Sequence, residues 1–152
     1  MKIKSIAAIC KKNKNIAIFE RYSDDGDILT QYIGDGSAVY PVVGLPQLDK
    51  ESLLTIFDVP EKDRDNYFVK TLGVPVGISF EDTDETERHV EREGISIIYS
   101  GRTLKPIRTT RGLVFIESRY LSPVADVLDV LELYERRTAE GAPYIVPKAG
   151  FL

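Results

Sequence analysis

The sequence predicts an α+β fold with an antiparallel or mixed sheet and about three packed helices. Apolar residues make up 43% of the 152 residues and charged residues 29%, a composition typical of a globular protein with a hydrophobic core. Helical patterns separate runs of short strands, which favours an antiparallel or mixed sheet over a doubly wound parallel one. We therefore expect a single domain over residues 1–152, in the order helix, strand meander, helix, strands, helix, strand.

A helix and a strand meander are expected first. The helix has an apolar stripe at i, i+3, i+4 and i+7, formed by Ile3, Ile6, Ala7 and Cys10. This stripe should lie on a sheet. Segments 16–22, 28–33 and 38–43 have the composition of strands, and the turns between them contain Gly and Asp.

The second predicted helix begins at an N-cap. Asp49 is the expected capping residue, and Leu48 and Leu53 are spaced as a hydrophobic staple. The helix should run through Phe57 and end before Pro60.

Strands and one more helix are expected in the second half. Residues 66–78 suggest a strand interrupted by Gly and Pro, and further strands are expected at 95–100, 105–110 and 113–117. The clearest helix pattern starts with Ser122 as N-cap and Pro123 at the first position, and Gly141 can close it. Its apolar stripe is Val124, Val127, Leu128, Leu131 and Tyr134. The apolar C-terminal segment, 142–152, is expected to dock as a last strand.

An acidic segment separates these elements. Residues 81–93 contain seven carboxylates and Val90 as the one aliphatic residue. We expect an exposed, mobile excursion there, because a segment without apolar side chains has little to anchor it.

Charge and cysteine content restrict the environment. No apolar run reaches the roughly 18 residues typical of a membrane span, so no membrane association is expected. The N-terminus has no signal-peptide pattern, which favours a cytoplasmic protein. The single cysteine, Cys10, excludes an intramolecular disulfide and is expected to be buried.

No catalytic or metal-binding motif is found. His89 lies in the acidic segment and is expected to be a solvated side chain, since a catalytic base needs an orienting partner and a pocket. Asp24, Asp25 and Asp27 fit a turn better than a calcium loop. We expect no cofactor, and an enzyme whose site the sequence does not reveal stays as an alternative.

Basic residues supply the candidate binding site. Arg102, Lys105, Arg108 and Arg111 recur every three residues, and Lys4, Lys11 and Lys12 lie on the first helix. In an extended strand a spacing of three alternates faces, so the four residues share a face only if a turn reorients the chain. They would contact DNA phosphates or an acidic partner, or would simply be solvated charges on an edge strand.

The order of elements from Lys4 to Arg102 resembles one domain of the bacterial DNA sliding clamp family. The resemblance lies in Ala38-Val39-Tyr40-Pro41-Val42 followed by Leu53-Leu54-Thr55-Ile56-Phe57 and Val59-Pro60-Glu61, and in the turn Ser100-Gly101-Arg102. It implies helices that line a basic DNA channel. The family's ring needs several such domains per chain, and this chain has length for little more than one.

These observations favour a non-enzymatic binding or assembly module. The expected partners are another protein or a second copy, with DNA as a further candidate in the clamp-like interpretation. A mobile-element accessory protein that acts only through protein partners is an alternative. For the protein-partner hypothesis, the apolar end at Phe151 and Leu152 is the expected contact.

Overall fold

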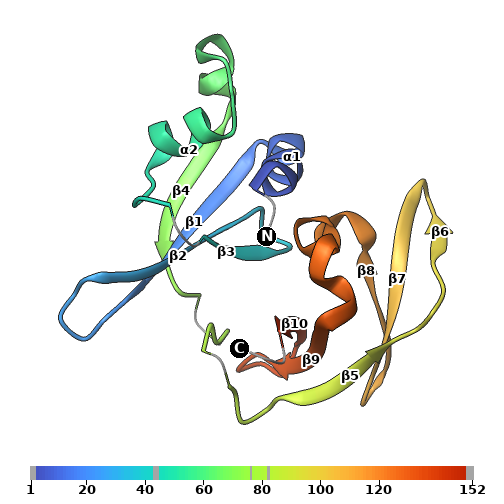
Figure 1. Cartoon of the computed structure of the whole chain (residues 1–152). Helices are drawn as coiled ribbons and strands as arrows, with labels where there is room; N and C mark the ends of the chain where they lie inside the picture. The colour runs from blue at the N-terminus through green and yellow to red at the C-terminus, as the bar shows by residue number, and fades with distance from the viewer. Residues whose placement is uncertain (1–2, 43–44, 76, 82, 150–152) are drawn as a thin grey trace. The chain divides into compact units, whose positions relative to one another are not determined.

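The computed structural model describes residues 3–42, 45–75, 77–81 and 83–149. Helices and two sheets form an α+β fold, as predicted, with both antiparallel and parallel strand pairs. The expected single domain stays a prediction, and the chain divides into two compact units, residues 2–75 and 76–152. The reason lies in the strand pairing: β1 to β4 pair among themselves, as do β5 to β10, so each unit has its own sheet (Figure 1).

The N-terminal unit contains a four-stranded sheet and two α-helices among its described residues. Its strand order is β3-β2-β1-β4, with β4 parallel to β1 and the other neighbours antiparallel. The elements are α1 (Ile3–Asn13), β1 (Asn15–Tyr22), β2 (Ile28–Gly34), β3 (Val39–Val42), α2 (Lys50–Ile56), the 3-10 helix η1 (Glu61–Asn66) and β4 (Phe68–Gly73). The predicted first helix, the meander and the second helix are therefore confirmed.

The core of this unit forms between α1 and the sheet. Ile6, Ala7 and Cys10 of the predicted stripe are buried, and α1 packs against β1 and β2. Ile18 and Ile33, which pair across β1 and β2, are also buried.

The start of α2 follows the sequence prediction closely. The side chain of Asp49 accepts a hydrogen bond from the Ser52 N–H at 2.9 Å, and the Asp49 N–H donates to Ser52 Oγ at 2.8 Å. This reciprocal pair is a capping box. Leu48 and Leu53 are both buried, as expected for a hydrophobic staple.

The C-terminal unit contains a curved sheet of order β10-β9-β5-β7-β6, with β8 paired to β7 (Figure 1). Residues 88–90 of β5 pair with β9, and residues 91 and 92 pair with β7. The elements are β5 (Arg88–Arg92), β6 (Ile97–Tyr99), β7 (Arg102–Thr109), β8 (Gly112–Glu117), the 3-10 helix η2 (Ser118–Val130), β9 (Leu131–Arg137) and β10 (Pro143–Ala149). The expected strands around 95–117 and the expected final strand are present.

The acidic segment is more ordered than the sequence predicted. Residues 88–92 form the strand β5 inside the sheet, and Val90 is buried with Ile107 and Leu133 in the core of this unit. The prediction of an exposed excursion is therefore wrong for this part. One aliphatic side chain suffices because the neighbouring strands supply the rest of the core.

The predicted long helix, which starts at Ser122 and closes at Gly141, is also wrong in its second half. A 3-10 helix, η2, covers 118–130, and Leu131 and Tyr134 belong to β9. Leu131, Leu133 and Glu135 share one face of β9, because successive residues of a strand point to opposite faces. Strand β9 also pairs with strands on both sides. This pairing outweighs the helical pattern of the isolated segment. The side chain of Leu128 and residues Phe151 and Leu152 lie outside what the structure describes.

Within the described ranges, helices are too short or too polar to span a membrane.

Candidate protein-binding surface

Strands β6, β7 and β8 form a three-stranded antiparallel ribbon in the C-terminal unit. Ser100 and Gly101 join β6 to β7 in a two-residue turn, and both have positive φ (50° and 74°), as a type I′ hairpin turn requires. Thr110 and Arg111 join β7 to β8, and the Thr109 hydroxyl donates to the Gly112 carbonyl at 2.7 Å across that turn. Two short hairpin turns thus fix the register of all three strands.

One face of this ribbon carries large exposed apolar side chains. Residues opposite each other in a ladder share a face, and the pairs Ile97–Leu104, Tyr99–Arg102, Pro106–Phe115 and Arg108–Leu113 follow one another along β7 on the same face. The exposed fractions are 36% for Ile97, 66% for Tyr99, 51% for Leu113 and 50% for Phe115. We call these four residues the ribbon face.

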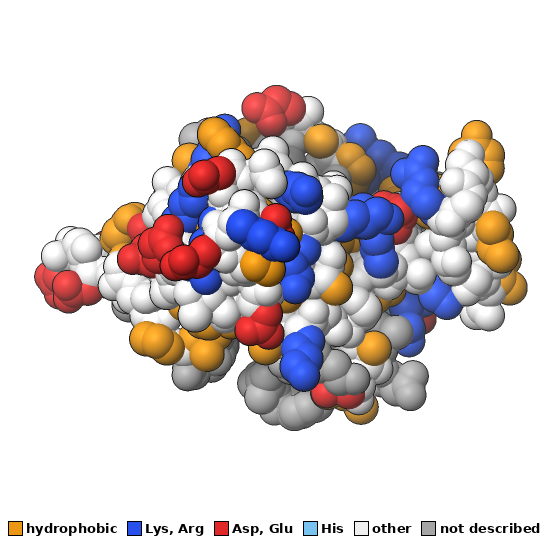
Figure 2. All heavy atoms as spheres, turned by 90° about the horizontal axis from the view of Figure 1, so that it is seen from above, with side chains coloured by type: hydrophobic (Ala, Val, Ile, Leu, Met, Phe, Trp, Pro, Cys, Tyr) orange, Lys and Arg blue, Asp and Glu red, His pale blue; other side chains and the backbone are white. Residues whose placement is uncertain are grey.

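The opposite side of the ribbon contributes to the hydrophobic core along β7 and β8, whereas Ile98 on that side of β6 is 79% exposed. Ile107 is fully buried and packs with Val90 and Leu133, and Val114 and Ile116 pack against this cluster. The run Leu113-Val114-Phe115-Ile116 is thus apolar on both sides. A continuous apolar run usually marks a strand buried on both faces, and here one face is exposed. In Figure 2, separate hydrophobic side chains are visible over the β6–β7 part of the C-terminal unit, with other side chains between them.

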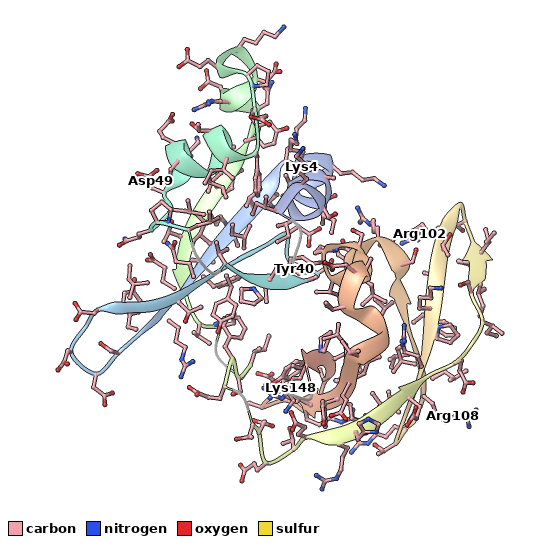
Figure 3. The ribbon with its side chains drawn as sticks, in the orientation of Figure 1. Lys4, Tyr40, Asp49, Arg102, Arg108 and Lys148 are labelled. Atoms are coloured by element: carbon pink, nitrogen blue, oxygen red, sulfur yellow. The ribbon has the colours of Figure 1, made fainter. Side chains whose placement is uncertain are left out.

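The four predicted basic residues from Arg102 to Arg111 do not share one face of the ribbon. Arg102 and Arg108 lie on the same face as the apolar residues, near opposite ends of β7 (Figure 3). Lys105 lies on the other face, where its Nζ donates to Ser96 Oγ at 2.6 Å. Arg111 is in the turn before β8. Because β7 continues through Pro106, no turn brings the four cations onto one face.

Two of these basic residues lie close to carboxylates. Arg108 forms an ion pair with Glu93 at 2.6 Å, and Arg102 Nε lies 4.0 Å from Glu117 Oε1. These contacts reduce the positive potential that the series would offer to a phosphate backbone.

The lysines of α1 belong to the N-terminal unit. Lys4 and Lys12 are exposed, whereas Lys11 is partly buried and its Nζ donates to the Phe57 carbonyl at 2.8 Å, just beyond α2 (Figure 3 for Lys4). The role of Lys11 in holding α1 to the end of α2 is not apparent from the sequence. Lys4 and Lys12 are the two lysines of this set that face solvent.

A polar groove of about 510 Å³ lies where β5 passes from β9 to β7. His89, Glu91, Glu93 and Glu132 are among the residues that line it. The His89 ring contacts the Tyr134 ring edge-to-face at 5.4 Å, and its Nδ1 lies 3.7 Å from Glu91 Oε1. Three carboxylates and two cations, Arg92 and Lys105, line this groove, so its charges do not favour a phosphate ligand.

The buried Arg136 and the partly buried Glu87 form an ion pair that sequence reasoning missed. Arg136 is 1% exposed, its Nη2 lies 2.9 Å from Glu87 Oε1, and it donates to the Ser79 and Glu81 carbonyls at 3.2 and 3.0 Å. Lys148 binds the second oxygen of Glu87 at 2.8 Å. Burial raises the pKa of Glu87, but the hydrogen bonds from Lys148 and Arg136 outweigh it and hold the pKa below the usual value. The network fastens the segment before β5 to β9 and β10.

Metal and thiol chemistry receive little support from the described residues. These include no group of three His, Cys, Asp or Glu side chains placed to hold a metal ion. Cys10 is buried, as predicted, and burial raises the pKa of its thiol to about 12. The thiol therefore stays protonated at neutral pH and is a poor nucleophile.

The ribbon face is the candidate site that the sequence analysis did not name. Its signal in the sequence is the uninterrupted apolar run at 113–116 together with Ile97, Ile98 and Tyr99, in segments that the sequence analysis predicts only as strands. Only the strand register separates the buried residues from the exposed ones. Comparison of the chain with protein-family models, with curated proteins and with solved structures found no match.

Proposed function

We propose that this chain is a non-enzymatic assembly module that binds protein through the ribbon face. The observation that carries this proposal is the exposure of Ile97, Tyr99, Leu113 and Phe115 on one face of a rigid ribbon. Exposed apolar residues are common singly, and several of them on one face are more typical of an interaction surface. Here they form two pairs, Ile97 with Tyr99 on β6 and Leu113 with Phe115 on β8, and Pro106 between them on β7 is buried. Aromatic residues and arginine are enriched at such surfaces, and here Arg102 and Arg108 flank the group.

The surroundings of the ribbon support binding rather than catalysis. The side chains on this face are mostly apolar or cationic, with Glu117 at one end, and the nearby groove is lined by carboxylates, two cations and apolar residues. A cytoplasmic location forms part of the proposal, and the single buried cysteine is compatible with it.

Sedimentation of the purified chain over a range of concentrations tests the proposal. The average mass should rise with concentration, and Phe115→Asp should shift association to at least about tenfold higher concentration, since it places a charge in an apolar contact. Phe68→Asp is the matched control, because Phe68 is 58% exposed and lies on β4 in the other unit. A parent chain that stays monomeric up to its solubility limit would refute the proposal, as would equal effects of the two substitutions.

DNA association is a second candidate, and the exposed Lys4 and Lys12 on α1 favour it. A clamp-like domain would use such a helix to contact phosphates, and binding to duplex DNA would fall steeply with added salt. Lys4→Ala with Lys12→Ala should weaken binding for all sequences alike, whereas Arg102→Ala with Arg108→Ala should have less effect because both arginines have carboxylate neighbours. Absence of binding to duplex DNA at low salt would exclude this function.

A further inference from the structure

Strand β8 is an edge of its sheet that lacks the usual protection. Among the described strands it pairs with β7 alone. Edge strands are commonly protected from pairing by Pro or Lys. The edge strand β10 has Pro143, Pro147 and Lys148, whereas β8, Gly-Leu-Val-Phe-Ile-Glu, has neither residue type.

The backbone of β8 offers hydrogen bonds on its outer side. The Glu93 N–H donates to the Pro106 carbonyl at 3.0 Å, so the backbone groups of Pro106 point toward β5 and away from β8. Phe115, opposite Pro106, is therefore in a pair without mutual hydrogen bonds. By alternation, the N–H and C=O groups of Leu113, Phe115 and Glu117 point to the outer edge of β8.

The outer edge of β10 is poorly suited to pair with another strand. The Thr138 N–H donates to the Ala142 carbonyl at 2.8 Å, which makes this a hydrogen-bonded pair. By alternation Tyr144, Val146 and Lys148 point toward β9, and Pro143 and Pro147 point outward. Proline has no N–H, so the outer edge of β10 lacks two donors that a pairing strand would need.

We infer that two copies of this chain pair along β8, antiparallel and about a two-fold axis at Val114, so that the two sheets become continuous. The inference rests on the proposed function and names its partner and its mode. A two-fold axis brings the same strand of both copies together, so the strand must complement itself.

Self-complementarity selects this register. Residues whose backbone N–H and C=O groups point outward must face such residues in the second copy. If most of β8 is to take part in the pairing, the two-fold axis must then lie at Leu113, Val114 or Phe115. An axis at Leu113 places Arg111 opposite Phe115, and an axis at Phe115 places Leu113 opposite Glu117. Only the axis at Val114 places Leu113 opposite Phe115 in both copies, which joins apolar with apolar. It also brings Arg111, in the turn before β8, opposite Glu117, a carboxylate that lies 3.4 Å from Arg119 and 4.0 Å from Arg102 in its own chain.

The pairing would also cover part of the ribbon face. Leu113 and Phe115 lie on that face, and both are half exposed in the single chain. In the pair, Leu113 and Phe115 of the two copies form one apolar cluster of four side chains, with an Arg111–Glu117 pair at each end. This arrangement explains why an edge strand carries an apolar run without Pro or Lys.

Charge reversal tests the register. Arg111→Glu alone and Glu117→Arg alone each place like charges opposite one another twice, so each variant should dimerise at least about tenfold more weakly than the parent. An equal mixture of the two variants restores opposite charges at both positions, so it should form the mixed dimer about as well as the parent forms its own. Sedimentation of each variant and of the mixture gives these values.

Cysteine cross-linking gives a second measurement that tolerates a poorly folded Glu117→Arg variant. Val114→Cys places the two thiols opposite each other with Cα atoms about 4.5 Å apart, within the range of a disulfide. Ile116→Cys is the matched control, because its two copies would be four residues out of register, about 13 Å apart. Under mild oxidation the first variant should form a covalent dimer and the second should not.

The outcomes separate the two proposals. If the parent associates and Phe115→Asp prevents it, but the mixture restores nothing and the two cysteine variants cross-link equally, edge pairing is overturned and the assembly function stands. If the parent never associates, both fail. Restored mixed dimers together with selective cross-linking at position 114 would establish the pairing.

Discussion

Replacement of Arg136 by Met should strongly destabilise the C-terminal unit. The guanidinium is buried and binds Glu87 and the carbonyls of Ser79 and Glu81. Removal of one partner of a buried ion pair costs about 3–5 kcal/mol, because the other charge stays buried. Glu87 is only partly buried and Lys148 still binds it, so we expect a loss no greater than the lower end, about 3 kcal/mol.

Urea unfolding followed by circular dichroism measures this loss, with hydrogen exchange of the β9 amides as a readout specific to the C-terminal unit. Arg108→Met is the matched control, since its ion pair with Glu93 is largely exposed and should contribute about 0–1 kcal/mol. Adding Glu87→Gln to Arg136→Met removes the stranded charge, so the double variant should lose less stability than the sum of the two single changes. Equal losses for Arg136→Met and Arg108→Met would refute the role of the buried pair.

Three further outcomes follow from burial and charge. Leu133→Ala should cost about 2–5 kcal/mol and Leu131→Ala less, since Leu133 is buried and Leu131 is only partly so; equal urea midpoints would contradict the placement of β9. The pKa of Glu87 is lowered in the folded chain, so the stability that its carboxylate contributes is present above the unfolded pKa and is lost as the pH falls through the folded pKa. The variant Glu87→Gln should therefore lose less stability than the parent on acidification from neutral pH. Parallel acid-unfolding curves of the two proteins would argue against this. Cys10 should react with a thiol reagent only after denaturation, and rapid labelling of the native chain would mean that α1 is open.

The sequence predicts the N-terminal unit better than the C-terminal one. There the local signals agree with the tertiary contacts: the stripe on α1 meets the sheet, and Asp49 caps α2 as its position suggests. In the C-terminal unit, pairing between distant segments decides the outcome. Leu131 fits a helical stripe, yet its segment becomes a strand between β5 and β10.

The candidate site depends on strand register, which local patterns do not reveal. Arg102 and Lys105 are three residues apart in the sequence and lie on opposite faces of β7, as a straight strand requires. Leu113 and Val114 are adjacent and equally apolar, and only their partners in β7 show that Leu113 lies with Arg108 on the exposed side and Val114 with the buried Ile107. A composition-based prediction assigns both to the core.

Hydrogen exchange of the β8 amides at several protein concentrations tests the central claim most directly. The N–H groups of Gly112, Val114 and Ile116 point toward β7 and should be protected at every concentration, which supplies an internal control. The N–H groups of Leu113, Phe115 and Glu117 point outward, so they should exchange rapidly in the dilute chain and become protected as the concentration rises. Rapid exchange of these three amides at concentrations where the chain is fully associated would contradict assembly through the edge of β8.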